Sequence, residues 1–175
     1  KPGILELVRK AGIKWLCLGI ESSDKKIRLE ISKGKFEDVD IRDVVQKVHD
    51  ADIEIMGNYM FGLPGDNFES MRRTLDLSME LCTVGWNAYA AMPLPGSHKL
   101  PENYAGYSFH AYNTQPLPTE HLTPEEVLKF RDEAWLKYHT YEPFLDKVEN
   151  KFGKTPRENI EKMTKVTLKR RILGD

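Results

Sequence analysis

The sequence has little cysteine and no clear excess of either charge. Its 175 residues include two cysteines, Cys17 and Cys82, and carry a formal net charge of -1. Two distant cysteines cannot form a cysteine-only metal site, and each lies in an apolar segment, so we expect buried thiols in a reducing compartment rather than a disulfide. The balanced charge gives no support for a nucleic-acid partner.

Long apolar runs and ligand-binding fingerprints are also missing. No run is long enough to cross a bilayer and no signal peptide is visible, so we expect a cytoplasmic protein without a membrane partner. No nucleophile motif, phosphate loop or dinucleotide fingerprint occurs, and no histidine has metal-ligand spacing to another histidine or to a cysteine. The composition, 40% hydrophobic and 30% charged, is typical of a folded globular protein.

The first residues lead directly into a helix pattern. Lys1 is followed by an amphipathic stretch that ends at Gly12, and there is no initiator methionine. We therefore expect the chain to be cut from a longer polypeptide. Its length favours one domain, or one domain with an appendage.

In residues 1–100, helix and strand patterns alternate. Apolar strand patterns span 13–20, 53–61 and 84–92. The alternation predicts right-handed βαβ units and a parallel sheet. Three strands are too few to close a barrel, which usually has eight, so we predict an α/β fold: an incomplete (β/α) barrel of three parallel strands with flanking helices. Helices are expected at 4–11, 25–31, 41–51 and 68–81.

The stretch around the middle strand is the most informative. Residues 53–61 are largely apolar on both sides, which predicts a strand buried on both faces. The strand ends at Gly62-Leu63-Pro64-Gly65-Asp66, whose glycines and proline predict a tight turn. Asn67 or Asp66 can cap the helix that follows, with Glu69 in its first turn. Such a turn before a helix predicts a place where bare backbone can approach a ligand.

The second half is predicted to be irregular and then helical. Residues 101–122 are rich in aromatic residues and prolines, and we expect this segment to pack on the barrel's open edge or to cover a site. Thr123 followed by Pro124 predicts a helix start. Residues 123–175 form the expected C-terminal helical extension, with a last, basic helix from Pro156 to Ile172 and solvated charges. The other two helices are expected at 123–141 and 144–152.

Polar residues or tight turns follow all three predicted strands. Glu21 and Ser22 follow the first, residues 62–66 the second, and Pro93-Leu94-Pro95-Gly96-Ser97 the third. The carboxyl ends of parallel strands meet at one edge, where such folds hold ligands, so we expect a binding site there. The Glu21 carboxylate can accept hydrogen bonds from a ligand's hydroxyl or ammonium group. The alternative is a helix cap or a solvent-facing side chain.

The order and spacing of these motifs resemble the C-terminal half of the radical S-adenosylmethionine (SAM) enzymes. Within that superfamily the likeness is to the branch whose members often carry an N-terminal cobalamin-binding domain. It covers residues 3–100, with a looser likeness over 123–145. The motifs that carry it are Ala11-Gly12, Leu18-Gly19-Ile20-Glu21-Ser22, Lys33-Gly34, Gly62-Leu63-Pro64-Gly65-Asp66, Glu69-Ser70 and Pro93-Leu94-Pro95-Gly96-Ser97.

The resemblance implies a six-stranded partial barrel, of which this chain holds the last three strands. The missing N-terminal half is then a partner within the same polypeptide. The longer protein would use SAM and a four-iron, four-sulfur (4Fe-4S) cluster, with cobalamin in that branch, for oxidoreductase or methyl-transfer chemistry on a small-molecule substrate. The Cys-x3-Cys-x2-Cys loop that holds the cluster is absent here. We therefore expect this chain alone to bind no cofactor stably and to be inactive.

By position, the resemblance also assigns residues to SAM. The ribose and methionine end would be contacted by Glu21 and Ser22. The adenine would be bordered through backbone by the end of the second strand, Phe61, Gly62, Leu63 and Pro64, and flanked by the end of the third, Met92 and Pro93. Two positions depart from the family pattern: Asp66 stands where glutamate is usual, and Asp52 where glycine is usual.

Two other interpretations stay open. A fragment of an aldolase- or isomerase-type α/β barrel would use Glu21 as a general base. A catalytic lysine or a phosphate-binding glycine run at a strand end would favour it, and Lys33 and Lys35, which lie in a predicted loop, fit poorly. A non-catalytic scaffold module would use the strands and helices only to present a surface to a partner, with a large exposed apolar edge.

Overall fold

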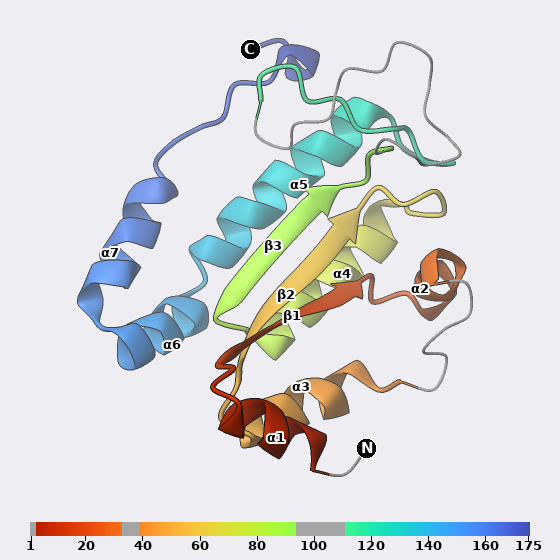
Figure 1. Ribbon diagram of the computed structural model, residues 1–175. Helices are drawn as coiled ribbons and strands as arrows, with labels where there is room; N and C mark the ends of the chain where they lie inside the picture. The colour runs from red at the N-terminus through yellow and green to blue at the C-terminus, as the bar shows by residue number, and fades with distance from the viewer. Residues whose placement is uncertain (1–2, 33–38, 94–110) are drawn as a thin grey trace.

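The computed structural model describes residues 3–32, 39–93 and 111–175. The predicted loop at Lys33–Lys35, most of the turn that begins at Pro93, and residues 94–110 with most of the aromatic segment lie outside the described residues. Within them, the chain folds as one open α/β sheet with helices against it and further helices after it (Figure 1). The predicted fold class is confirmed.

Three parallel strands make the sheet, in the order β1-β2-β3. Their bounds are β1 Trp15–Glu21, β2 Glu54–Phe61 and β3 Gly85–Ala90. In the register Leu16 lies opposite Ile55, and Gly57 lies opposite Trp86. Among the described residues β1 has a strand neighbour on one side only, so its outer edge carries unpaired backbone groups.

The helices begin where the sequence places capping residues. Asp40 caps α3 by accepting from the Arg42 amide at 2.8 Å, and Thr123 and Glu126 form a reciprocal capping box at the start of α5. None of the helices in the described part of the chain could span a membrane. Their bounds are α1 Ile4–Lys10, α2 Lys25–Ser32, α3 Ile41–Asp50, α4 Phe68–Leu81, α5 Pro124–His139, α6 Glu142–Phe152, α7 Lys154–Met163 and the 3-10 helix η1 Arg171–Leu173.

One face of the sheet packs against helices and forms the core. Tyr59 and Phe61 of β2 and Trp86 of β3 are buried there with apolar side chains of α4 and α5, and α4 is drawn behind the sheet in Figure 1. The Trp86 ring stacks on Tyr138 of α5 at 4.8 Å between centroids. Apolar burial of this kind supplies most of the driving force for folding.

The opposite face, which we call the open face, is only partly covered. Met56 and Met60 of β2 are half-buried on it, and Cys17 of β1 is exposed. The prediction that β2 is buried on both faces holds fully for the helix side, whereas on the open face Glu54 is buried and Met56, Asn58 and Met60 are half-buried. The prediction of two buried thiols is wrong for Cys17, which is exposed on the open face of an edge strand, β1. Cys82 is half-buried, and both cysteines are free.

The last helix is shorter than predicted. Helix α7 ends at Met163 rather than near Ile172, and the chain then continues without regular structure to η1. Arg170, expected on a solvated helix end, has an extended backbone (φ -132°, ψ 113°) and a fully buried side chain paired with Asp132 of α5. A helix through residue 170 is incompatible with that backbone conformation and that ion pair.

Asp52 occupies a backbone conformation that favours glycine. Its φ is 55°, its amide donates to the His49 carbonyl, and the Ile53 amide donates to the Val48 carbonyl, which closes α3 with a left-handed residue. The side chain forms an exposed ion pair with Arg9. The glycine that is usual at this position in the resembling family therefore fits the observed geometry.

We expect Asp52→Gly to raise the urea midpoint of unfolding. Glycine adopts the left-handed conformation without strain, and the exposed pair with Arg9 that it removes contributes little. Asp52→Asn is the control, because it removes the same charge and keeps a side chain in the strained conformation. If Asp52→Gly proves less stable than Asp52→Asn, this interpretation of the helix end is wrong.

Candidate functional site

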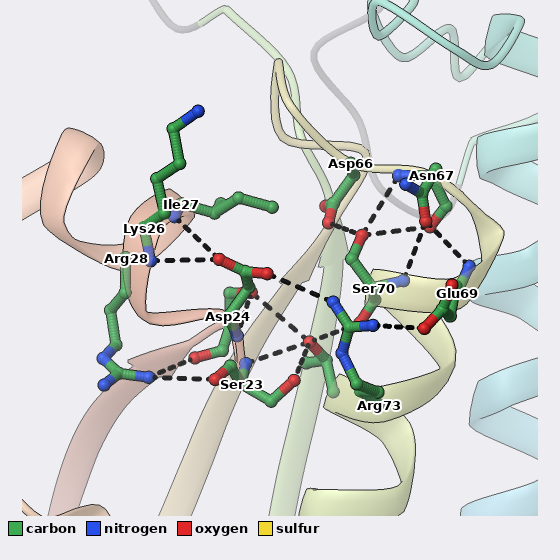
Figure 2. A network of polar contacts seen from close by, with 12 residues as sticks. Ser23, Asp24, Lys26, Ile27, Arg28, Asp66, Asn67, Glu69, Ser70 and Arg73 are labelled. Atoms are coloured by element: carbon green, nitrogen blue, oxygen red, sulfur yellow. Dashed lines mark hydrogen bonds and ion pairs between the residues drawn. The ribbon is translucent and has the colours of Figure 1, made fainter.

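The residues that follow the three strands lie along one edge of the sheet, which we call the rim (residues 21–24, 61–66 and 91–93). The strands are parallel, so their carboxyl ends meet there. The Ala91 amide donates to the Phe61 carbonyl at 2.7 Å and joins the ends of β2 and β3. Figure 2 shows the polar contacts that join the end of β1 to the start of α4.

Glu21 ends β1 with its side chain folded back over the open face. The register shifts between Gly19 and Glu21, and Glu21 has a φ of 63°. A Cβ atom at Gly19 would lie 2.6 Å from Glu21 Oε1, so the carboxylate lies directly over this glycine. It receives no hydrogen bond or ion pair from any described residue, and partial burial raises the pKa of the carboxyl.

Ser22 is turned away from the open face. Its side chain is fully buried, its hydroxyl accepts from the Asp24 amide at 3.1 Å, and it lies 3.4 Å from the Thr74 hydroxyl. The Ser23 amide donates to the same Thr74 oxygen at 3.0 Å. These contacts fasten the end of β1 to α4 and use the Ser22 hydroxyl within the protein.

Asp24, not Glu21, caps helix α2. Its carboxylate accepts from the Lys26 amide at 3.0 Å and the Ile27 amide at 3.2 Å (Figure 2). Its other oxygen accepts from Arg73 of α4 at 3.1 Å. The helix-capping alternative for Glu21 is therefore excluded, and Glu21 stays available to a ligand.

The turn after β2 is organised by a buried carboxylate. Asp66 accepts from the Leu63 amide at 2.9 Å and from the Ser70 hydroxyl at 2.5 Å, while Asn67 caps α4 through the Glu69 and Ser70 amides. Of the two caps offered by the sequence, Asn67 is the one used. Burial raises the pKa of Asp66, and the hydrogen bonds from Ser70 and the Leu63 backbone act against that rise.

Packing against α5 explains why the first residue of the turn, Gly62, has no side chain. Gly62 has a φ of 79°, and a Cβ there would lie 2.3 Å from Val127 Cγ1. The following polar backbone groups are largely used within the protein: the Leu63 carbonyl accepts from the Asp66 amide, and the Pro64 carbonyl accepts from the Glu120 amide at 3.0 Å. The turn would therefore contact a ligand mainly through its surface, because few of its hydrogen-bonding groups are free.

The other residues assigned to the rim differ in exposure. The Phe61 side chain is buried on the helix side, with its ring 5.2 Å from that of Phe130, while Pro64 is exposed. Met92 is half-buried and Pro93 is buried. Among the assigned side chains, Glu21, Pro64 and Met92 thus have solvent-accessible surface, and Phe61 can face a ligand only through its backbone.

The polar support beneath the rim was not identified from the sequence. Ser70, Thr74 and Ser78 of α4 are all buried, and the first two hold Asp66 and the end of β1. Their spacing of four residues on an otherwise apolar face was an available signal, because it predicts small polar groups on one helix face. The described residues contain no group of histidine, cysteine, aspartate or glutamate able to hold a metal ion.

Comparison with known proteins shows a similarity over part of the chain. The chain is 30% identical over 80 residues to the bacteriochlorophyllide d C-12(1)-methyltransferase of Chlorobaculum tepidum. The matched stretch makes up 46% of this chain and 18% of that methyltransferase, so the similarity spans less than a fifth of the relative. No family model matches the chain.

We expect Gly62→Ala to lower the free energy of unfolding by about 2–4 kcal/mol, because alanine is strained at positive φ and its methyl group would collide with Val127. Urea denaturation measures the loss. In a Val127→Ala background the same glycine substitution should cost less, because the collision is absent and the backbone strain remains. A loss below about 1 kcal/mol for the single variant would contradict the packing shown here.

We expect the Glu21→Gln variant and the original protein to be equally stable near pH 4. At pH 7 we expect the variant to be as stable as the original protein or more stable. The raised pKa of Glu21 means that the folded protein favours the protonated carboxyl. The stabilisation from this preference is present below the ordinary glutamate pKa of about 4.3 and is lost as the pH rises through the higher pKa of Glu21 in the folded protein. Thermal unfolding across this pH range measures the effect. A variant less stable at pH 7 would reveal a structural partner for the carboxylate.

Proposed function

We propose that this chain is the C-terminal part of a radical SAM enzyme and that its rim binds the nucleoside of SAM. The observation that carries the proposal is Glu21: a carboxylate without a partner among the described residues, beside the 62–66 turn at one edge of a parallel sheet. The similarity to a methyltransferase supports it, since methyl transfer is one of the reactions expected of this branch.

The residues at the rim fit a nucleoside. Ribose hydroxyls are donors, and the Glu21 carboxylate is an acceptor held over Gly19 on a half-buried side chain. The exposed Pro64 ring and the half-buried Met92 side chain supply apolar surface for the adenine. Ser22 acts in this proposal as a positioning residue, since its hydroxyl holds the turn that follows Glu21.

The cluster ligands would come from outside these 175 residues, since the sequence has two cysteines and no Cys-x3-Cys-x2-Cys loop. In the resembling family, SAM bound at such a cluster is the source of a 5′-deoxyadenosyl radical. The residues of this chain would bind and orient the nucleoside and exclude water from one side of it. The unpaired edge of β1 and the open face offer a place for the missing half-barrel.

A general-base role for Glu21 is the second candidate. A half-buried carboxylate with a raised pKa and no partner in the described part of the chain has the properties of a base in an aldolase- or isomerase-type barrel. The two candidates differ in their ligand: the first requires affinity for an adenine nucleoside, and the second does not. Nucleoside binding therefore separates them.

We expect Glu21→Gln in the full-length polypeptide to weaken binding of S-adenosylhomocysteine by about tenfold or more, because an anionic acceptor for the ribose hydroxyls becomes a neutral amide. Isothermal titration calorimetry measures the dissociation constant. Binding by the original protein should also weaken as pH falls through the raised pKa of Glu21, and this pH dependence should disappear in the variant.

Glu69→Gln is the matched control. Glu69 is an exposed carboxylate of α4 that pairs with Arg73 at 2.7 Å, and it does not belong to the rim. Its substitution should leave the dissociation constant unchanged. Equal affinity of Glu21→Gln and the original protein would reject the assignment of Glu21 to the ribose, and an original protein without affinity for the nucleoside would reject the proposed function.

A further inference from the structure

A buried arginine joins segments that are far apart in the sequence. Arg170 donates from Nε and Nη2 to the two carboxylate oxygens of Asp132 on α5, at 2.8 and 3.0 Å. Its Nη1 donates to the Ala111 carbonyl at 3.1 Å and to the Thr114 hydroxyl at 3.3 Å. The side chain is fully buried. A charge-assisted, bidentate pair fixes orientation as well as contributing energy.

The residues after Arg170 close around the same segment. The Arg171 amide donates to the Tyr112 carbonyl at 2.8 Å, and the Tyr112 hydroxyl donates to the main-chain carbonyl of Asp175 at 3.1 Å. The Asp175 carboxylate accepts from the Arg170 amide at 3.2 Å. We call residues 170–175 the clasp and residues 111–120 the strap. Figure 1 draws the clasp, blue and near the C label, beside the cyan-green strap.

The strap in turn contacts the rim. The Leu117 amide donates to the Ala91 carbonyl at 3.3 Å, and the Glu120 amide donates to the Pro64 carbonyl at 3.0 Å. The Thr119 hydroxyl donates to the Asp66 carbonyl at 2.8 Å. These bonds end on the two rim segments that follow β2 and β3. An unbroken series of contacts therefore leads from Arg170 to the backbone proposed to border the adenine.

We propose that the clasp holds the strap on the rim, and that Arg170 is thereby a positioning residue for nucleoside binding. The first part depends on the structure alone, and the second rests on the proposed function. In the described part of the chain, the side-chain hydrogen bonds of Arg170 go to Asp132, Ala111 and Thr114 and not to the rim, so its effect passes through the strap. Loss of the clasp would free the strap and allow the turn at Pro64 and Asp66 to move.

The neighbourhood of Asp132 makes Arg170 the better residue to change. Arg131 also pairs with Asp132 at 2.7 Å, and its Nε donates to the Ala88 carbonyl of β3 at 2.9 Å. Removing Arg170 therefore leaves Asp132 with a cationic partner. Removing Asp132 would leave a fully buried guanidinium without its carboxylate, which is the more disruptive change. Methionine at position 170 preserves much of the buried apolar volume.

The first measurement is hydrogen exchange on the full-length polypeptide with Arg170→Met. We expect the Leu117 and Glu120 amides to exchange about tenfold faster or more, with the amides of β2 unchanged, because local opening of the strap leaves the sheet folded. Arg171→Met is the matched control: it makes the same substitution on the exposed neighbouring side chain. Unchanged exchange at Leu117 and Glu120 would overturn the clasp.

The second measurement is calorimetric titration with S-adenosylhomocysteine, which gives affinity and stoichiometry together. A positioning role predicts a dissociation constant about fivefold higher or more at unchanged stoichiometry, since displaced binding groups weaken contact in every molecule. Loss of folded protein alone would lower the stoichiometry at unchanged affinity and would overturn the positioning role. Equal affinity despite faster strap exchange would overturn it as well.

Two outcomes keep this inference separate from the proposed function. If the original protein binds no S-adenosylhomocysteine, the proposed function and the positioning role fail together, while hydrogen exchange still decides whether the clasp exists. If Arg170→Met does not fold, Arg170→Lys replaces it, because lysine keeps the buried cation and loses the planar fork. An exchange rate for Arg170→Lys equal to that of the original protein would overturn the clasp.

Discussion

The rim depends on the buried Asp66 carboxylate. It receives the Leu63 amide and the Ser70 hydroxyl, and the Ser70 carbonyl in turn accepts from Thr74, whose hydroxyl holds the Ser23 amide at the end of β1. A buried carboxylate is costly unless such donors satisfy it, so the turn, the start of α4 and the end of β1 are fixed as one unit. The rim is thus formed by the protein's own hydrogen bonds.

The alternation of elements could be predicted because each element carries its own local signal. Periodicity identified the helices and strands, and Asp40 and Thr123 marked two helix starts. The end of the chain could not be predicted in this way. The partner of Arg170 is Asp132, 38 residues earlier, and a basic stretch after a helix pattern gives no indication of a buried ion pair with a distant helix.

That the three strand ends lie along one edge could be predicted from the sequence, but the contacts of the residues there could not. Co-location of the strand ends followed from parallel topology, while the internal use of the Ser22 hydroxyl and the availability of Glu21 depend on Thr74 and Asp24, which sequence spacing does not connect to them. The exposure of Cys17 has a similar cause, because an apolar strand pattern does not reveal which strand lies at the sheet's edge.

A structure of the full-length polypeptide with bound S-adenosylhomocysteine tests the central claim most directly. The account predicts ribose hydroxyls at hydrogen-bonding distance, about 2.5–3.0 Å, from the Glu21 carboxylate, with the adenine against the 62–66 turn and Met92. A nucleoside bound elsewhere, with Glu21 facing only water or an added protein segment, would contradict it.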